Sequence, residues 1–180
     1  MTKEEPFAAF KLCIFGEGGV GKSTLTQRYL TGVFNESTKM TIGADFYIKD
    51  VDIEGKRVRL RIWDFGGEEQ FRVLMPSFAK NAQGGIFMYD ITRYASMKKI
   101  DEWLGFFTAS TDKQLKIPVI MVGGKHDLQE KRSITEENAM DIAKSHNLTG
   151  YCECSSKTGV NVQEIFEMIT REMLQNEGYL

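Results

Sequence analysis

The chain has 180 residues, of which 42% are hydrophobic and 27% charged, and its formal net charge is −2. These values are ordinary for a soluble globular protein that can bury a core, and we expect a single domain spanning residues 1–180. The weak charge gives no electrostatic reason to bind nucleic acid or an anionic membrane, and no apolar run approaches the length of a membrane span.

Short apolar runs predict six strands. The first covers Phe10–Phe15. Two longer runs, Ala44–Ile53 and Arg57–Phe65, alternate apolar and polar residues around Gly55, which predicts a hairpin. Three further strands are predicted later in the chain, at Gly85–Asp90, Val119–Gly123 and Gly150–Cys154.

The stretches between these strands predict about five helices. The first follows a glycine-rich turn and ends near Thr31, and the others cover Glu69–Asn81, Ser96–Ser110, Thr135–His146 and Val162–Gln175. Strand–helix alternation of this kind implies an α/β fold, with a six-stranded, mostly parallel sheet and one antiparallel edge strand. Ligands bind such sheets at the carboxyl ends of the strands, so we expect the chemistry in the loops that follow them.

The three cysteines do not form a metal or disulfide motif. Cys13, Cys152 and Cys154 contain no CxxC pair, and an odd number argues against a disulfide framework or a zinc site. Cys152 and Cys154 alternate within a predicted strand, so we expect both to pack on one buried face. This usage fits a reducing cytoplasm.

A complete phosphate-binding motif follows the first strand. Residues 16–23, Gly-Glu-Gly-Gly-Val-Gly-Lys-Ser, match G-x-x-x-x-G-K-[ST] between a strand and a helix. The glycines let backbone N–H groups curl around a phosphate, and the helix N-terminus adds partial positive charge. Lys22 is expected to reach the β- and γ-phosphates, and Ser23 to ligate Mg²⁺. The expected nucleotide-binding residues here are Gly16, Glu17, Gly18, Gly19, Val20, Gly21, Lys22, Ser23 and Thr24.

The same segment also fits the dinucleotide pattern G-x-G-x-x-G at Gly16, Gly18 and Gly21. Dinucleotide sites lack the Lys22-Ser23 pair and need an acid at the end of the second strand. The second predicted strand contains several aspartates but no clear match, so this alternative is weak.

A second loop places an acid before two glycines. Asp64 ends a predicted strand and is followed by Phe65, Gly66, Gly67 and Glu68. Asp64 is placed to hold Mg²⁺ through water, and the Gly67 N–H can bind a γ-phosphate. Two glycines also form a hinge that can move when that phosphate leaves.

Two further motifs complete a family pattern. Lys125-His126-Asp127 follows the fifth predicted strand, and Ser155-Ser156-Lys157 follows the sixth. From about Phe10 to Leu174 the order of motifs resembles the Ras superfamily of small GTPases, which implies a P-loop NTPase fold, the G domain, over that core.

The resemblance implies how the base is recognised. Lys125 and Asp127 match the family motif N-K-x-D, in which the acid accepts two N–H bonds from guanine and the lysine stem lies along the base. Adenine presents an acceptor to that carboxylate, so Asp127 selects guanine. The N–H of Ser156, within the Ser155–Lys157 motif, is expected to contact the guanine O6. Phe34 stands where the family places an aromatic ring against the base or ribose.

The resemblance is nearest to the Rab branch. Residues 41–46, Thr-Ile-Gly-Ala-Asp-Phe, match the Rab segment T-I-G-x-D-F, in which Thr41 ligates Mg²⁺ only when GTP is bound. Phe46, Trp63 and Phe78 match an aromatic triad that faces effectors in Rab proteins, and Ile42 lies in the same effector segment. Ordinary packing is the alternative for the three aromatic residues.

Several positions depart from the family pattern. Glu68 replaces the glutamine that orients the attacking water, and Gly124 replaces the asparagine of N-K-x-D. Restoring an asparagine at position 124 is therefore expected to slow nucleotide release. Phe65 and Gly66 make a D-x-G-G motif that resembles the Arf and heterotrimeric G-α proteins. The end of the chain, residues 176–180, has no cysteine for prenylation, so no membrane anchor is visible in this chain.

We therefore expect a GTP/GDP molecular switch, an enzyme that hydrolyses GTP slowly with Mg²⁺. The expected catalytic residues are Lys22, Thr41, Gly67 and Glu68, with Glu68 turned outward in the resting protein, and the expected metal ligands are Ser23, Thr41 and Asp64. A GTP-loaded binding module with negligible hydrolysis is the alternative, because Glu68 affects hydrolysis more than binding. The resemblance implies effectors, exchange factors and GTPase-activating proteins as partners of a monomer that is cytoplasmic and peripheral to membranes through partners.

Overall fold

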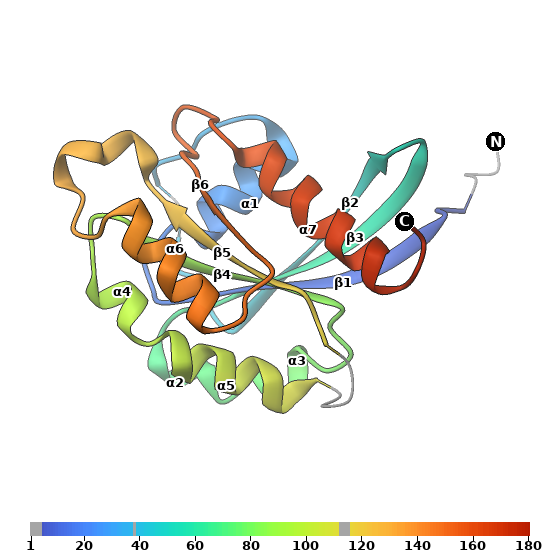
Figure 1. The fold of residues 1–180 in the computed structure, drawn as a ribbon, viewed down its shortest axis with the longest axis horizontal. Coiled ribbons are helices and arrows are strands. Elements are labelled where there is room, and N and C mark those ends of the chain that lie inside the picture. The colour runs from blue at the N-terminus through green and yellow to red at the C-terminus, as the bar shows by residue number, and fades with distance from the viewer. Residues whose placement is uncertain (1–4, 38, 112–115) are drawn as a thin grey trace.

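A computed structural model describes residues 5–37, 39–111 and 116–180. Within these residues a six-stranded sheet has the order β2-β3-β1-β4-β5-β6 (Figure 1). Only the β2–β3 pair is antiparallel among the strand pairs of the described chain. The strands are β1 (Ala8–Phe15), β2 (Ala44–Ile53), β3 (Lys56–Phe65), β4 (Gly84–Asp90), β5 (Val119–Gly124) and β6 (Gly150–Glu153). The predicted α/β sheet with an antiparallel edge is confirmed.

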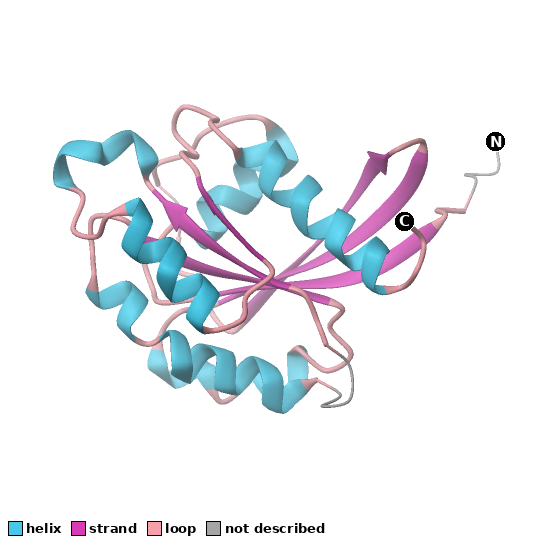
Figure 2. Cartoon of the chain, in the orientation of Figure 1, coloured by secondary structure: helices cyan, strands magenta, loops and turns pink. Residues whose placement is uncertain are grey.

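Helices cover both faces of this sheet (Figure 2). In the described chain they are α1 (Lys22–Thr31), α2 (Glu69–Arg72), α3 (Met75–Phe78), α4 (Ala95–Lys98), α5 (Ile100–Ser110), α6 (Glu136–Ser145) and α7 (Val162–Asn176), with a 3₁₀ helix η1 (His126–Lys131). Helices α1 and α7 pack on one face, and α3, α5 and α6 pack on the other. Thr135 caps α6 as its sequence indicates, because its side chain accepts a hydrogen bond from the Asn138 N–H.

Two predicted helices are each divided in the structure. The stretch predicted as one helix at Glu69–Asn81 forms the short helices α2 and α3, and Pro76 at the start of α3 has no N–H with which to continue the preceding turn. The stretch predicted at Ser96–Ser110 forms α4 and α5, which are separated at Lys99 where φ is −90° and ψ is 18°. The described residues therefore hold seven α-helices where the sequence predicts about five.

The core lies in two layers, one on each face of the sheet. Alternate residues of β1 serve both layers: Leu12 and Ile14 face α1 and α7, whereas Cys13 and Phe15 face α5. A strand covered on both sides is almost entirely apolar, and in β1 only Lys11 interrupts the apolar run, so this strand is easily predicted from the sequence. Cys152 and Cys154 both pack into the layer under α7, as predicted.

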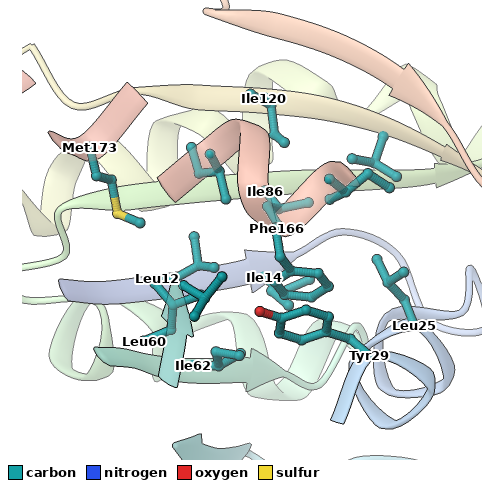
Figure 3. Close-up of a cluster of buried hydrophobic side chains, with 14 of the residues drawn as sticks. Leu12, Ile14, Leu25, Tyr29, Leu60, Ile62, Ile86, Ile120, Phe166 and Met173 are labelled. Atoms are coloured by element: carbon teal, nitrogen blue, oxygen red, sulfur yellow. The ribbon is translucent and has the colours of Figure 1, made fainter. Parts of the chain in front are cut away.

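An aromatic pair joins the helices of the first layer (Figure 3). The ring of Tyr29 in α1 stacks on the ring of Phe166 in α7, with centroids 3.8 Å apart and planes 7° from parallel. Phe166 is fully buried. This stack packs α1 against α7 on one face of the sheet, and the glycine-rich loop leads directly into α1.

We expect Phe166→Ala to lower the free energy of unfolding by about 3–5 kcal/mol, because it removes a buried ring and leaves a cavity. The measurement is urea unfolding followed by far-UV circular dichroism. Phe7→Ala is the matched control, since Phe7 is 52% exposed, and should cost less than about 1 kcal/mol. Equal losses in the two variants would contradict the importance of the α1–α7 stack.

Candidate functional site

The glycine-rich loop of residues 16–21 connects β1 to α1 at the carboxyl edge of the sheet. It lies directly against β4: a Cβ atom on Gly16 would lie 2.1 Å from the carbonyl oxygen of Met88. Gly16 also has φ of 143°, a conformation that other residues rarely adopt. The loop can occupy this position only with glycine at its start.

Lys22 brings a buried positive charge to the loop. Its residue is 6% exposed, and its Nζ donates hydrogen bonds to the carbonyl oxygens of Gly16 and Glu17, each at 2.8 Å. Burial lowers the pKa of Lys22 to about 8, against the charges of Asp64 and Glu17, which raise it. Neutral carbonyl groups only partly replace the water that this ammonium group has lost, so an anion beside it would be strongly favoured.

Three oxygen-bearing side chains meet next to Lys22. The Ser23 hydroxyl donates to Asp64 Oδ2, and its oxygen lies 2.8 Å from Thr41 Oγ1. In the described part of the chain Asp64 Oδ1 is buried and has no hydrogen-bond partner. Burial raises the pKa of Asp64 to about 6, although the Ser23 hydrogen bond and the Lys22 charge lower it. Hydroxyl and carboxylate oxygens around an unpaired acceptor fit the preferences of Mg²⁺.

A cavity of about 280 Å³ opens over this group. Its walls come from the glycine-rich loop, from the segment that carries Thr41 and from the loop after β3. The lining residues are Gly18, Gly19, Gly21, Lys22, Ser23, Thr24, Lys39, Met40, Thr41, Phe65, Gly66, Gly67 and Glu68. The cavity therefore brings together Lys22, Gly67 and two of the predicted Mg²⁺ ligands, Ser23 and Thr41. The third predicted ligand, Asp64, is buried behind the wall and reaches the site through its hydrogen bond with Ser23.

Two glycines allow these three segments to touch through their backbones. A Cβ atom on Gly67 would lie 2.2 Å from the backbone N of Gly18, and one on Gly66 would lie 2.6 Å from the Thr41 carbonyl oxygen. The Gly66 N–H also donates to the Gly43 carbonyl oxygen at 2.8 Å. No larger residue could be placed at position 66 or 67 without moving one of the segments.

Glu68 is turned toward the phosphate cavity, which corrects the expectation that it points outward. Its carboxylate oxygen Oε1 would lie 2.6 Å from a Cβ atom on Gly18, so the side chain is folded over the glycine-rich loop. The charge of Glu68 also acts on the buried Lys22, whose pKa it raises. Glu68 thus stands at the mouth of the site even though the residue is exposed.

A second cavity, of about 380 Å³, adjoins the first at the ends of β5 and β6. It is lined by Gly19, Val20, Gly21, Thr24, Phe34, Glu36, Met88, Lys125, Asp127, Leu128, Ser156 and Lys157. The sequence assigns the base to Phe34, Lys125, Asp127, Ser156 and Lys157, and the structure gathers all five there. Its size and its mixture of apolar and polar walls suit an aromatic base.

Buried partners hold the two main residues of the second cavity in place. The Ser155 hydroxyl donates to Asp127 Oδ1 at 2.7 Å. The Lys125 ammonium group lies 2.7 Å from Asp90 Oδ2 and donates to the Gly19 carbonyl oxygen at 3.2 Å. Burial raises the pKa of Asp90, but hydrogen bonds from Lys125 and Thr92 hold it below its ordinary value. Lys125 is therefore stretched from its loop toward the glycine-rich loop.

Three predicted nucleotide-binding residues line neither cavity. The carbonyl oxygen of Gly16 accepts a hydrogen bond from Lys22, and the hydroxyl of the buried Ser155 donates one to Asp127. The carboxylate of Glu17 points away from the cavities and accepts hydrogen bonds from Arg72 at 2.7 Å and from the Trp103 Nε1–H at 2.9 Å. This carboxylate therefore links the glycine-rich loop to α2 and α5.

The structure adds residues that the sequence analysis missed. Arg93 donates a hydrogen bond to the Gly18 carbonyl oxygen at 2.8 Å, and Met88 lines the second cavity. Nothing in a buried apolar strand marks Met88 as different from its neighbours, and Arg93 belongs to no motif. Glu36, Lys39 and Met40 could have been found, because they lie between Phe34 and Thr41 in the chain.

Three of the four predicted effector residues form a connected group of aromatic rings. The ring of Trp63 lies 5.0 Å from that of Phe46 and 5.6 Å from that of Phe78. Phe46 is 45% exposed and Ile42 is 75% exposed, whereas Trp63 and Phe78 are partly buried against the core. The aromatic triad therefore combines surface exposure with packing.

Comparisons with known proteins agree with this arrangement. The model of the Ras family matches residues 11–175. The chain is 34% identical to Ras-related protein Rab-19 of Xenopus laevis, over 98% of the chain and 83% of that relative. It is 36% identical to Ras-related protein Rab-13 of Rattus norvegicus, over 94% and 82%, and 35% identical to Ras-related protein Rab-18 of Lymnaea stagnalis, over 99% and 87%. The protein therefore belongs to the Ras family of small GTPases and is similar to its Rab members.

Proposed function

We propose that this small GTPase is a slow GTP/GDP switch whose phosphates bind in the first cavity and whose guanine binds in the second. Its family membership establishes a GTP-binding protein that hydrolyses GTP to GDP with Mg²⁺. The single observation that carries the site assignment is the buried Lys22, which interacts with the charge of Asp64, whose Oδ1 has no hydrogen-bond partner among the described residues. A group that binds an anion and an acceptor for a metal ion are then close together.

Ser23, Thr41 and Asp64 are the residues that would hold Mg²⁺, the last through water. The ion, when bound, supplies charge that offsets the triphosphate. Lys22 would bind the β- and γ-phosphates, and backbone N–H groups of the glycine-rich loop, which lines the cavity, would add donors to the anion. The Gly67 N–H, in a segment that lies against Gly18, would donate to the γ-phosphate.

Glu68 sets the rate of hydrolysis in this proposal. Its carboxylate can accept a hydrogen bond from the attacking water, but when ionised it cannot donate one to the transition state. A negative charge about 4 Å from the γ-phosphate could cost roughly 4 kcal/mol at an effective dielectric constant of 20. The observed turn of Glu68 toward Gly18 keeps that charge close, and so supports slow hydrolysis.

The alternative function is a GTP-loaded binding module with negligible hydrolysis. Glu68 is the observation that favours it, because the repulsion acts on hydrolysis and leaves the base pocket untouched. Chromatography of the nucleotide released from the purified protein separates the two. Mainly GDP indicates a completed cycle, whereas mainly GTP supports the binding module.

Membership of the family gives this chain effectors, exchange factors and GTPase-activating proteins as general classes of partner. We infer that Ile42, Phe46, Trp63 and Phe78 form the effector surface and that the chain acts as a monomer. Among the described residues, none of the helices has the length and apolar character needed to cross a bilayer. A peripheral attachment to membranes through partners is part of this proposal.

Lys22→Ala should weaken GDP binding by at least about a hundredfold, because the variant loses the charged donor to the phosphates. The measurement is equilibrium titration with a fluorescent GDP. Lys131→Ala, at an exposed lysine of η1, is the control and should bind as the parent does. Unchanged affinity in Lys22→Ala would show that the phosphate site is misassigned.

Asp127→Asn should shift the preference from guanine to xanthine nucleotides, because the xanthine C2 carbonyl can accept a hydrogen bond from the new amide. The amide oxygen can still accept the Ser155 hydrogen bond, so the loop should keep its shape. Competition of XTP and GTP against a fluorescent GDP measures the shift. Asp141→Asn on the exposed side of α6 is the control, and a retained GTP preference in Asp127→Asn would rule out its role.

Glu68→Gln should accelerate single-turnover GTP hydrolysis by about tenfold, which corresponds to about 1.4 kcal/mol of the barrier. The substitution removes the charge near the γ-phosphate and adds a donor. Glu69→Gln, one residue later on the exposed surface of α2, is the control and should leave the rate unchanged. A sharply slower Glu68→Gln variant would mean that Glu68 is itself a catalytic base.

A further inference from the structure

One apolar side chain enters the base cavity from the centre of the sheet. Met88 lies in β4, is 1% exposed and lines the second cavity together with Lys125 and Asp127. Met88 belongs to the core layer on the face of the sheet that α1 and α7 cover. Met88 therefore belongs both to the core and to the wall that faces the ligand.

The tip of Met88 fills the space that a side chain at position 124 would need. A Cβ atom on Gly124 would lie 2.5 Å from Met88 Cε and 3.1 Å from the Val20 carbonyl oxygen. A Cβ atom on Gly21 would lie 3.6 Å from the same Cε atom. The methyl group thus lies between the glycine-rich loop and the loop that carries Lys125 and Asp127.

We propose that Met88 is a base-contacting residue that takes the place of a side chain at position 124. Its thioether packs against the guanine ring and fills the seam between the phosphate loop and the base loop. A polarizable, flexible sulfur side chain suits this position, since it adapts to irregular gaps and makes favourable contacts with aromatic rings. The inference rests on the proposed base cavity.

This arrangement changes what an asparagine at position 124 would do. From the sequence alone, Gly124→Asn is expected to slow nucleotide release. In the structure the new side chain must first displace Met88, so the gain of an amide is offset by the loss of the thioether contact. The two positions are therefore energetically coupled, and neither can be interpreted without the other.

Release of a fluorescent GDP, chased with unlabelled GDP in excess Mg²⁺, tests the contact directly. Met88→Val should accelerate release by roughly two- to tenfold, the range of one sulfur–aromatic contact. Met121→Val is the matched control, because Met121 is a fully buried methionine in β5 that packs in the opposite layer. Both variants should melt at lower temperature, but only Met88→Val should release GDP faster. Equal acceleration in both would overturn the proposal.

The coupling is tested by a double-mutant cycle. Gly124→Asn alone should not slow release, whereas Met88→Val/Gly124→Asn should release GDP more slowly than Met88→Val. Slower release in Gly124→Asn alone, to the same degree as in the double variant, would show that Met88 does not occupy this space. A parent protein that binds no GDP would contradict the proposed function itself, whereas normal binding with release rates indifferent to position 88 would contradict only this inference.

Discussion

A buried ammonium group governs the architecture of the site. The ammonium group of Lys22 is largely buried from water, and it donates hydrogen bonds to two backbone carbonyl oxygens instead. The negative charges that further stabilise it come from separate parts of the chain. Asp64 arrives at the end of β3 and Glu68 follows it, and both charges favour the protonated lysine. The parallel register that sets Ile14 of β1 beside Asp64 of β3 places the acid at the height of the glycine-rich loop. The strand order and register of the sheet thereby place the negative charge of Asp64 next to Lys22.

Features encoded by neighbouring residues could be predicted from the sequence. The phosphate loop is one contiguous motif, so its position after β1 and before α1 follows from residues 16–23 alone. The base residues are separated in sequence, but each follows a predicted parallel strand, and parallel strands end at one edge. That rule predicts that Asp127 and Ser156 lie at the same edge of the sheet, and both line the second cavity.

Features that depend on contacts between distant segments could not be predicted. Glu68 lies over Gly18, a residue of a separate loop, and the amphipathic pattern of residues 69–81 conceals the effect of Pro76 on the helix. Met88 is the clearest case: its strand has the pattern of a uniform core, and its tip lines the second cavity where Gly124 in the next strand has no side chain. From the sequence alone, Gly124 is a missing side chain in the N-K-x-D motif. In the structure, Met88 of the neighbouring strand fills the space beside it.

The same glycines that let the loops approach also determine how a ligand acts on the surface. Around the first cavity the phosphate loop and the two loops that follow α1 and β3 meet through main-chain atoms, with Gly67 against Gly18 and Gly66 bonded to Gly43. The cavity between them is therefore walled by backbone positions as well as by the side chains of Lys22 and Glu68. Gly43 immediately precedes β2, which carries Phe46 against Trp63. The cavity and the exposed aromatic surface are thus joined by one short segment of backbone.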